Sequence, residues 1–389
     1  MDKKKILLIL GFAGFVVMAD NWVVSPILPS IAQNLNVDIA SASIIISAYM
    51  LPFGLFQLLY GYLAECFGKR QVITFSISMF TIATALCAFS IALPDLTAYR
   101  ALTGMFAAAI MPVSLALIGD LFPMEERQSA IGSFMGISFL GQGLSMAIGG
   151  SIAYFLNWRG VFGVYAGLAV VSSILLFTIG KKIPSTKNKE SKAIMPYINV
   201  LKNPSSVIIY ALVIFEGIFL IGSFSFLGGF IKQIFELNNF AIGMVMTAFG
   251  VMALLAGRKS GMIAAKIGRK KTATIGLSSA FLADLLLVTM GSFLPTVVIA
   301  IGLMGFGFML ANSTFLTIAT EFAAKARGIA MSLVAFCFMG GGGIGTAIGG
   351  KIVAASSFQM LFAIYGTGLL LLTLSALLVK NSFKSSIQS

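Results

Sequence analysis

The chain has 389 residues, of which 58% are hydrophobic and only 10% are charged, and its mean hydropathy is +1.00. Soluble domains devote about a quarter of their residues to charge, so this composition excludes an ordinary soluble enzyme. Histidine is absent, which excludes imidazole as a base, a metal ligand or a proton relay. The three cysteines, Cys66, Cys87 and Cys337, lie far apart, so the sequence predicts neither a disulfide framework nor a metal site.

Twelve apolar runs follow one another along the chain, separated by short polar segments. A helix needs about 20 apolar residues to cross the hydrocarbon core of a bilayer, and these runs do not resemble the alternating strands of a membrane barrel. We therefore expect twelve transmembrane helices, at about 6–32, 41–64, 72–93, 96–122, 129–155, 161–180, 205–231, 241–264, 272–293, 296–322, 328–354 and 359–379. The first run is too long for a cleavable signal peptide, and no cleavage-site pattern follows it.

The basic residues fall on alternate loops. If both termini are cytoplasmic, all but four of the 26 Lys and Arg residues lie on the cytoplasmic side, the exceptions being Arg100, Arg159, Lys232 and Lys351. Cytoplasmic loops of membrane proteins carry such an excess of positive charge. The formal net charge of +13 therefore indicates topology in a lipid bilayer, and nucleic acid is not an expected partner.

One long polar segment, 181–204, separates the sixth run from the seventh. It contains six Lys residues against Glu190 alone, and prolines at 184, 196 and 204. We expect a cytoplasmic linker with a short interfacial helix near 195–201, and we favour a solvated connector over a binding site for anionic lipid. The predicted domains are an N-terminal six-helix bundle at 1–180 and a C-terminal six-helix bundle at 205–389 that ends in a short cytoplasmic tail.

The two predicted bundles repeat each other at an offset of 200 residues. The segment GYLAECFGKR at 61–70 corresponds to GMIAAKIGRK at 261–270, and GQGLSMAIGG at 141–150 corresponds to GGGIGTAIGG at 341–350. Arg127 and Arg327 match at the same offset. Parallel halves of six helices with a binding site between them are typical of transporters.

The turn after the second run resembles the signature loop of the major facilitator superfamily, G-x-L-A-D-x-x-G-R-K. The matching residues here are Gly61, Leu63, Ala64, Glu65, Gly68, Lys69 and Arg70. The resemblance implies a conformational latch that joins the two halves and includes an acid at the end of helix 4, a position that Asp120 fills. Glu65 replaces the usual Asp, and the second copy has Ala265 there, so the latch is expected to be asymmetric; a plain positive-inside turn is the alternative.

Two further segments resemble the same family. Arg100-Ala-Leu-Thr-Gly104 matches a helix 4 pattern in which the arginine is tied to proton coupling, although snorkelling of Arg100 to the membrane surface is the alternative. Gly132, Gly141, Gly149 and Gly150 match the glycine spacing of helix 5 in the family's antiporters. Ser145 and Met146 stand where that pattern has Gly-Pro, so we expect close helix packing without the kink.

Two acids lie near the middle of apolar runs. Asp20 is in run 1 and Glu216 is in run 7, the corresponding helix of the second half. An ionised carboxylate is costly there, so such a group faces a cavity, finds a partner or binds a proton. Asp20 resembles the helix 1 acid of drug–proton antiporters and is our first candidate for proton coupling and substrate binding, with Arg100 and Glu216; structural pairing is the alternative.

Polar groups on the inner helices are further candidates for lining a cavity. These are Asn21, Gln57, Gln142 and Asn312. Interhelical hydrogen bonds are the alternative explanation for them. Asp284 lies on a helix that is peripheral in the family, and we expect it to have a partner in runs 7 or 8.

The sequence thus predicts an all-α membrane protein with twelve transmembrane helices in two pseudo-symmetric bundles, the major facilitator fold. We expect a monomeric secondary transporter of a bacterial cell membrane, with both termini cytoplasmic, that exports small lipophilic or cationic compounds by proton antiport. Transport of a specific metabolite, such as a sugar, nucleoside, amino acid derivative or lipid, is the alternative, and a receptor or scaffold without transport is a third reading. No nucleotide-binding loop or catalytic motif is present, so we expect neither an enzyme, nor a cofactor, nor a metal.

Overall fold

The computed structural model describes residues 3–185, 198, 200–202, 204–322 and 327–379. Its elements, in chain order, are α1 (Lys3–Trp22), α2 (Val24–Asn34), α3 (Ile39–Ala42), α4 (Ile44–Phe67), α5 (Lys69–Ala88), α6 (Leu93–Ala107), α7 (Ile110–Leu121), α8 (Met124–Phe155), α9 (Trp158–Thr178), the 3₁₀ turn η1 (Gly180–Lys182), α11 (Pro204–Glu216), the π-helical turn η2 (Gly217–Ile221), α12 (Gly222–Phe235), α13 (Asn239–Ile267), α14 (Arg269–Met290), α15 (Leu294–Phe322), α16 (Arg327–Ala355) and α17 (Phe358–Leu378).

Within these residues, 12 helical segments are long and apolar enough to cross a membrane, which confirms the predicted number of spans. One boundary differs visibly, because α8 begins at Met124 where the sequence pattern predicts a start near 129. Pro123 precedes the helix and the next turn is charged, so α8 extends beyond its apolar stretch. The predicted interfacial helix near 195–201, most of the 181–204 linker and the C-terminal tail lie outside the described residues.

Two spans are broken by proline. The first span is divided between Trp22 and Val24, and Pro26 lies four residues after Trp22. The fourth span is divided between Ala107 and Ile110, and Pro112 lies four residues after Ala108. A proline lacks the N–H that would bond to the carbonyl four residues earlier, and its ring clashes with that carbonyl, so each break stands where the prolines require it.

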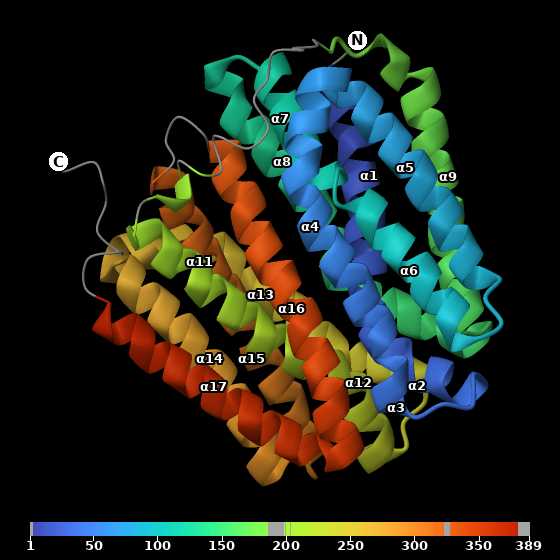
Figure 1. The fold of residues 1–389 in the computed structure, drawn as a ribbon, viewed down its shortest axis with the longest axis vertical. Helices are drawn as coiled ribbons and strands as arrows, with labels where there is room; N and C mark the ends of the chain where they lie inside the picture. Colours follow the sequence, from blue (N-terminus) through green and yellow to red (C-terminus); the bar gives the residue numbers. More distant parts are fainter. Residues whose placement is uncertain (1–2, 186–197, 199, 203, 323–326, 380–389) are drawn as a thin grey trace.

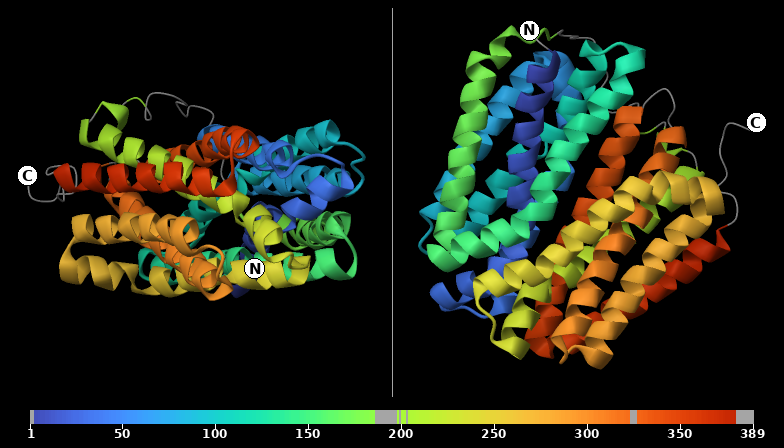
Figure 2. Two further views of the ribbon diagram at one scale, coloured as in Figure 1. Left: turned by 90° about the horizontal axis from the view of Figure 1, so that it is seen from below. Right: turned by 180° about the vertical axis from the view of Figure 1, so that it is seen from behind.

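The helices form two bundles, which Figure 1 shows as a blue-to-green group (α1 to α9) and a yellow-to-red group (α11 to α17). We call the end of the molecule that holds the turns at Gly68 and Gly268, each followed by cations, the basic end. The opposite end, where α2 ends and α13 begins, is called the far end. Figures 1 and 2 show the ribbons of the two bundles side by side at the far end and diverging toward the basic end.

Glycines let the two bundles meet backbone to backbone. A Cβ atom at Gly250 of α13 would lie 2.5 Å from the Cα of Gly143 in α8. A Cβ at Gly54 of α4 would lie 3.1 Å from the backbone nitrogen of Gly340 in α16. Small residues at such positions allow membrane helices to approach closely. The α8–α13 and α4–α16 contacts are therefore two glycine seams that join the halves.

Hydrogen bonds between the bundles lie toward the far end. The Ser25 hydroxyl on α2 contacts the carbonyl oxygens of Phe224 and Ser225 on α12, at 2.9 and 3.1 Å. Ser30 of α2 donates to the side-chain oxygen of Asn239 on α13 at 2.7 Å. The conformation is thus one in which the two halves are closed together at the far end.

The repeat predicted from the sequence is present in the backbone and in its contacts. Gly68 and Gly268 end their helices with φ angles of +96° and +87°, a region that favours glycine. The Tyr365 hydroxyl donates to the Gly345 carbonyl at 2.5 Å, and Tyr165, 200 residues earlier, makes the equivalent contact at 3.5 Å. Equivalent residues therefore brace the two halves in the same way.

Adding one methyl group to a seam tests this packing. Gly250→Ala should lower the free energy of unfolding by about 1–3 kcal/mol, because the new Cβ meets backbone that cannot move aside. Gly132→Ala is the matched control, since nothing lies within 4 Å of its Cβ position and Ala is the better helix former. Thermal unfolding of both purified variants measures the difference, and equal midpoints would contradict the close backbone contact between α8 and α13.

Candidate functional site

Asp20 and Arg100 form an ion pair inside the first bundle. A guanidinium nitrogen of Arg100 on α6 lies 2.7 Å from a carboxylate oxygen of Asp20 on α1, and their side chains are 1% and 0% exposed. The guanidinium carbon lies 4.3 Å from the centre of the Tyr49 ring and 5.5 Å from that of Phe162. Arg100 therefore does not snorkel to the membrane surface in this conformation.

The pair leaves hydrogen-bonding capacity unused. The second carboxylate oxygen of Asp20 and the Nε of Arg100 have no hydrogen-bond partner among the described residues. Each charge compensates the other, while the two aromatic rings stabilise the cation. The sequence interpretation named both residues, but it did not pair them, and it did not identify Tyr49 or Phe162.

Among the residues that the structure describes, no cation pairs with Glu216. It is the last residue of α11, its side chain is fully buried, and neither carboxyl oxygen forms a hydrogen bond within the described part of the chain. Asn312 on α15 is close enough to interact with the carboxyl but lacks hydrogen-bond geometry. A carboxylate in this position is costly unless a proton or a cation compensates it.

The backbone changes its helical register directly after Glu216. The π-helical turn η2 covers Gly217–Ile221, and Gly217 lies against the backbone of Phe338 and Gly342 on α16. Such turns are rare and are frequently found at functional sites. The π-turn therefore places an irregular, tightly packed backbone segment beside the unpaired acid.

Asp284 is a third fully buried acid, on α14. One of its carboxyl oxygens accepts a hydrogen bond from Ser223 of α12 at 2.9 Å. The other oxygen has no partner among the residues that the structure describes. The expected partner in run 7 is therefore Ser223, which follows the π-turn on the same span as Glu216.

An aromatic cluster fills the junction between the bundles. The ring centres of Trp22 and Phe224 are 5.1 Å apart, as are those of Trp22 and Phe249, and Phe308 lies 5.7 Å from Trp22. Phe338 continues the cluster at 5.2 Å from Phe308. The sequence interpretation missed this cluster, although Trp22 follows Asp20 by two residues and is one of only two tryptophans.

The predicted cavity-lining residues are buried or partly buried. Asn21, Gln57 and Gln142 are buried, and each has at least one polar atom without a hydrogen-bond partner in the described ranges. The amide nitrogen of Asn312 is in the same situation. Buried polar atoms are normally paired, so these four amides could still bind water or a polar ligand. The structure brings Asn312 near Glu216, and it records no hydrogen bond that joins the other three.

The predicted latch residues gather at the basic end. The ammonium of Lys69 lies 2.9 Å from a Glu65 oxygen and 2.8 Å from an Asp120 oxygen, and Arg70 donates to the Lys181 carbonyl. Gly61 lies on α4, about one turn before Glu65, and Gly68 ends the helix about two turns after Gly61. These contacts lie within the first half and its adjoining turn, so in this conformation they stabilise that half and the latch between the halves remains a prediction.

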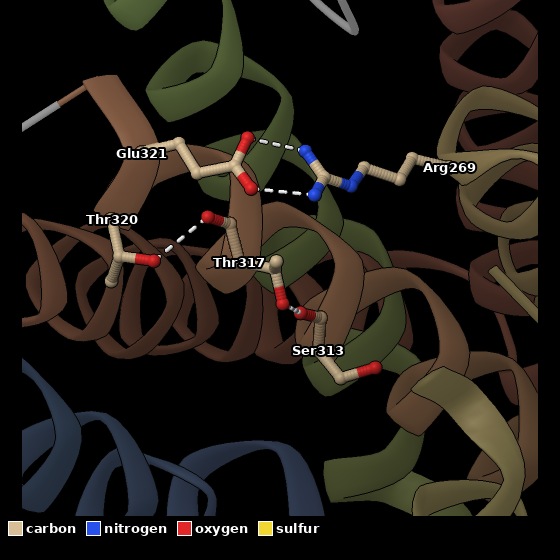
Figure 3. A network of polar contacts seen from close by, with 5 residues as sticks. All are labelled: Arg269, Ser313, Thr317, Thr320 and Glu321. Carbon is tan, nitrogen blue, oxygen red and sulfur yellow. Dashed lines mark hydrogen bonds and ion pairs between the residues drawn. The ribbon is translucent and has the colours of Figure 1, made fainter. Parts of the chain in front are cut away.

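The second half has a similar ion pair, although it lacks the equivalent of Glu65 and its acid, Glu321, lies one residue after the position that corresponds to Asp120. Arg269, which corresponds to Lys69, binds the Glu321 carboxylate with both terminal guanidinium nitrogens, and Nη2 lies 2.5 Å from Oε1 (Figure 3). The other residues drawn in Figure 3, Ser313, Thr317 and Thr320, form successive hydroxyl-to-carbonyl bonds along α15. Each half therefore ties the start of one helix to the end of another with a cation and an acid.

Known proteins resemble this chain in sequence and in fold. A sequence profile described as Major Facilitator Superfamily matches residues 10–323 and 221–388. The uncharacterized MFS-type transporter YceJ of Bacillus subtilis is 29% identical over 95% of this chain and 94% of its own length. The multidrug transporter protein MdtP of the same organism is 25% identical over 92% and 77%. The crystal structure of a D-xylose-proton symporter superposes with a TM-score of 0.78 at 17% identity, over 98% of this chain and 99% of that one.

The two central acids should respond oppositely to neutralisation. Asp20→Asn leaves Arg100 buried without its anion and should lower the free energy of unfolding by about 3–5 kcal/mol. Glu216→Gln replaces an unpaired carboxyl with a neutral group of the same shape and should leave stability unchanged or increase it. Chemical or thermal unfolding of the two purified variants at neutral pH provides the measurement. A larger loss in Glu216→Gln than in Asp20→Asn would overturn the assignment of the paired and unpaired acids.

Proposed function

The chain belongs to the major facilitator superfamily of secondary transporters, and from that premise we propose that it exports small lipophilic or cationic compounds in exchange for protons. The name of MdtP, which matches most of this chain, supports export of several compounds. The single observation that carries the proposal is the Glu216 carboxyl, which is fully buried beside the π-turn and pairs with no cation among the described residues.

Glu216 can bind either of two positively charged ligands, one at a time. With a proton bound, the carboxyl is neutral and its burial costs little. Without the proton, it is an anion in a low-dielectric span and attracts a cation. Since proton and cationic substrate compete for the same carboxyl, binding one favours release of the other, which is the requirement for antiport. The Trp22 cluster offers aromatic surface that suits lipophilic cations.

Asp20 and Arg100 have a related role in our proposal. They face each other in the half opposite Glu216, and their charges compensate as long as the pair is closed. A proton on Asp20 would remove the anion and leave Arg100 to find another partner or to move. We therefore propose that protonation of Asp20 couples proton movement to rearrangement of the first bundle, in concert with Glu216.

The charge distribution supports an orientation of the chain in the membrane. We place the basic end and both termini in the cytoplasm of a bacterial cell, because Lys and Arg are concentrated on the cytoplasmic side of membrane proteins. The far end then faces outward, and the conformation described here is the one that receives substrate from inside. Opening of the far end and closure of the basic end, with the Lys69 cluster as a latch, would complete alternating access.

Neutralising Glu216 tests the proton-coupling role. In proteoliposomes that contain the wild-type protein, adding the lipophilic cation ethidium should cause protons to be released in exchange. The Glu216→Gln variant should show no such release. Asp284→Asn is the matched control, because Asp284 is equally buried in the same bundle but bonded to Ser223. Proton release that persists in Glu216→Gln, or transport confined to a single metabolite, would contradict the proposal.

Neutralising Asp20 tests the coupling role of the ion pair. Asp20→Asn should bind ethidium while losing substrate-dependent proton release, because the pair can no longer open and close with a proton. Binding is measured by fluorescence and proton release by a pH-sensitive dye inside the vesicles. Unchanged coupling in this variant would restrict Asp20 and Arg100 to a structural role.

A further inference from the structure

An apolar pocket of about 420 Å³ lies where α4 of the first half meets α11 and α16 of the second. Its rim includes Leu51, Leu55 and Ile344, whose side chains are 40%, 53% and 43% exposed. All three are apolar and belong to segments long and apolar enough to cross a membrane, so we infer that these exposed surfaces face lipid. We call this site the α4–α16 pocket.

The pocket is continuous with one of the glycine seams. Gly340, which lines the pocket, contacts Gly54 of α4, and Gly341 packs against the backbone of Ile214 on α11. The walls therefore come from both halves and are held by backbone contacts. The pocket exists in this shape only while α4 and α16 touch, so a ligand bound there favours that conformation.

The lining identifies the chemistry of the occupant. The lining side chains are apolar, and the Cys337 sulfur is their only heteroatom. Water in a cavity needs two to four polar partners, which these side chains do not offer. A polar or charged compound would lose its own hydrogen bonds on entry. Hydrocarbon, which surrounds the rim, gains dispersion contacts with the walls at no such cost.

We propose that the α4–α16 pocket binds one hydrocarbon chain of a membrane phospholipid, and that the bound chain stabilises the conformation closed at the far end. The pocket lining does not include Glu216, and α16 packs closely on both sides of this residue, with Gly341 against Ile214 of α11 and Phe338 against Gly217 of η2. The lipid chain is thus a structural ligand of the junction, and its binding does not depend on which compound is transported.

A tryptophan placed in the pocket wall reports on the occupant. Phosphatidylcholine with brominated acyl chains, which quench tryptophan, is titrated into the detergent-purified Phe336→Trp variant. We expect saturable quenching at a few lipids per protein. Phe177→Trp is the reference for ordinary lipid contact, because Phe177 is 59% exposed on α9, and its quenching should rise without saturation as the lipid content of the micelle rises. The two native tryptophans are buried, so brominated lipid should quench their fluorescence very little.

Filling the pocket should abolish the saturable signal. A Cβ at Gly340 has nothing within 4 Å, so Gly340→Leu can occupy the pocket without striking the helix backbone. Gly163→Leu is the matched control, because a Cβ at this exposed glycine on α9 likewise meets nothing within 4 Å. In the Phe336→Trp background, Gly340→Leu should remove the saturable quenching and Gly163→Leu should preserve it. Phospholipid should likewise raise the thermal midpoint of Gly163→Leu more than that of Gly340→Leu.

Three outcomes would overturn the proposal. The first is identical titration curves for Phe336→Trp and Phe177→Trp, which by itself decides the matter if Gly340→Leu does not fold. The second is saturable quenching that survives in Gly340→Leu. The third is relief of the quenching by ethidium in direct competition, which would assign the pocket to the exported compound instead of lipid.

Discussion

The cost of placing a charge inside a membrane span organises this structure. The first half meets that cost internally, because Asp20 and Arg100 compensate each other between two aromatic rings. The second half does not, because Glu216 is buried without a cation in the described residues. The two halves repeat each other in backbone and in seams, yet they differ in how a buried acid is compensated.

The irregular backbone segments lie close to these charges. The break after Trp22 follows Asp20, the break at Ala108 follows Arg100 by about two turns, and the π-turn follows Glu216 directly. Irregular backbone within a span leaves polar groups to be satisfied by neighbours and is tolerated where protein surrounds it. Asp20 and Glu216 are therefore within a few residues of an irregular segment of their own span, and Arg100 is about two turns from one.

Hydropathy predicted the twelve spans and placed Asp20, Arg100 and Glu216 inside them, because each of these is a property of a single run. The matches at an offset of 200 residues predicted the two-half arrangement. Pairing was not predictable, since Arg100 lies 80 residues from Asp20 and either could have had another partner. The π-turn has no proline to announce it, unlike the breaks near Pro26 and Pro112. The Trp22 cluster was missed because its other members are phenylalanines on four different helices, and with 34 Phe in the chain none of these stands out.

The glycine seams have a thermodynamic consequence. Where Gly143 meets Gly250 and Gly54 meets Gly340, the halves touch through backbone, so little side-chain surface is buried at these points and little is exposed when they separate. The seams therefore oppose separation only weakly, and the cost of opening the junction falls mainly on the Trp22 cluster and on the hydrogen bonds at the far end. A change of about 1.4 kcal/mol in that cost shifts the ratio of closed to open molecules tenfold.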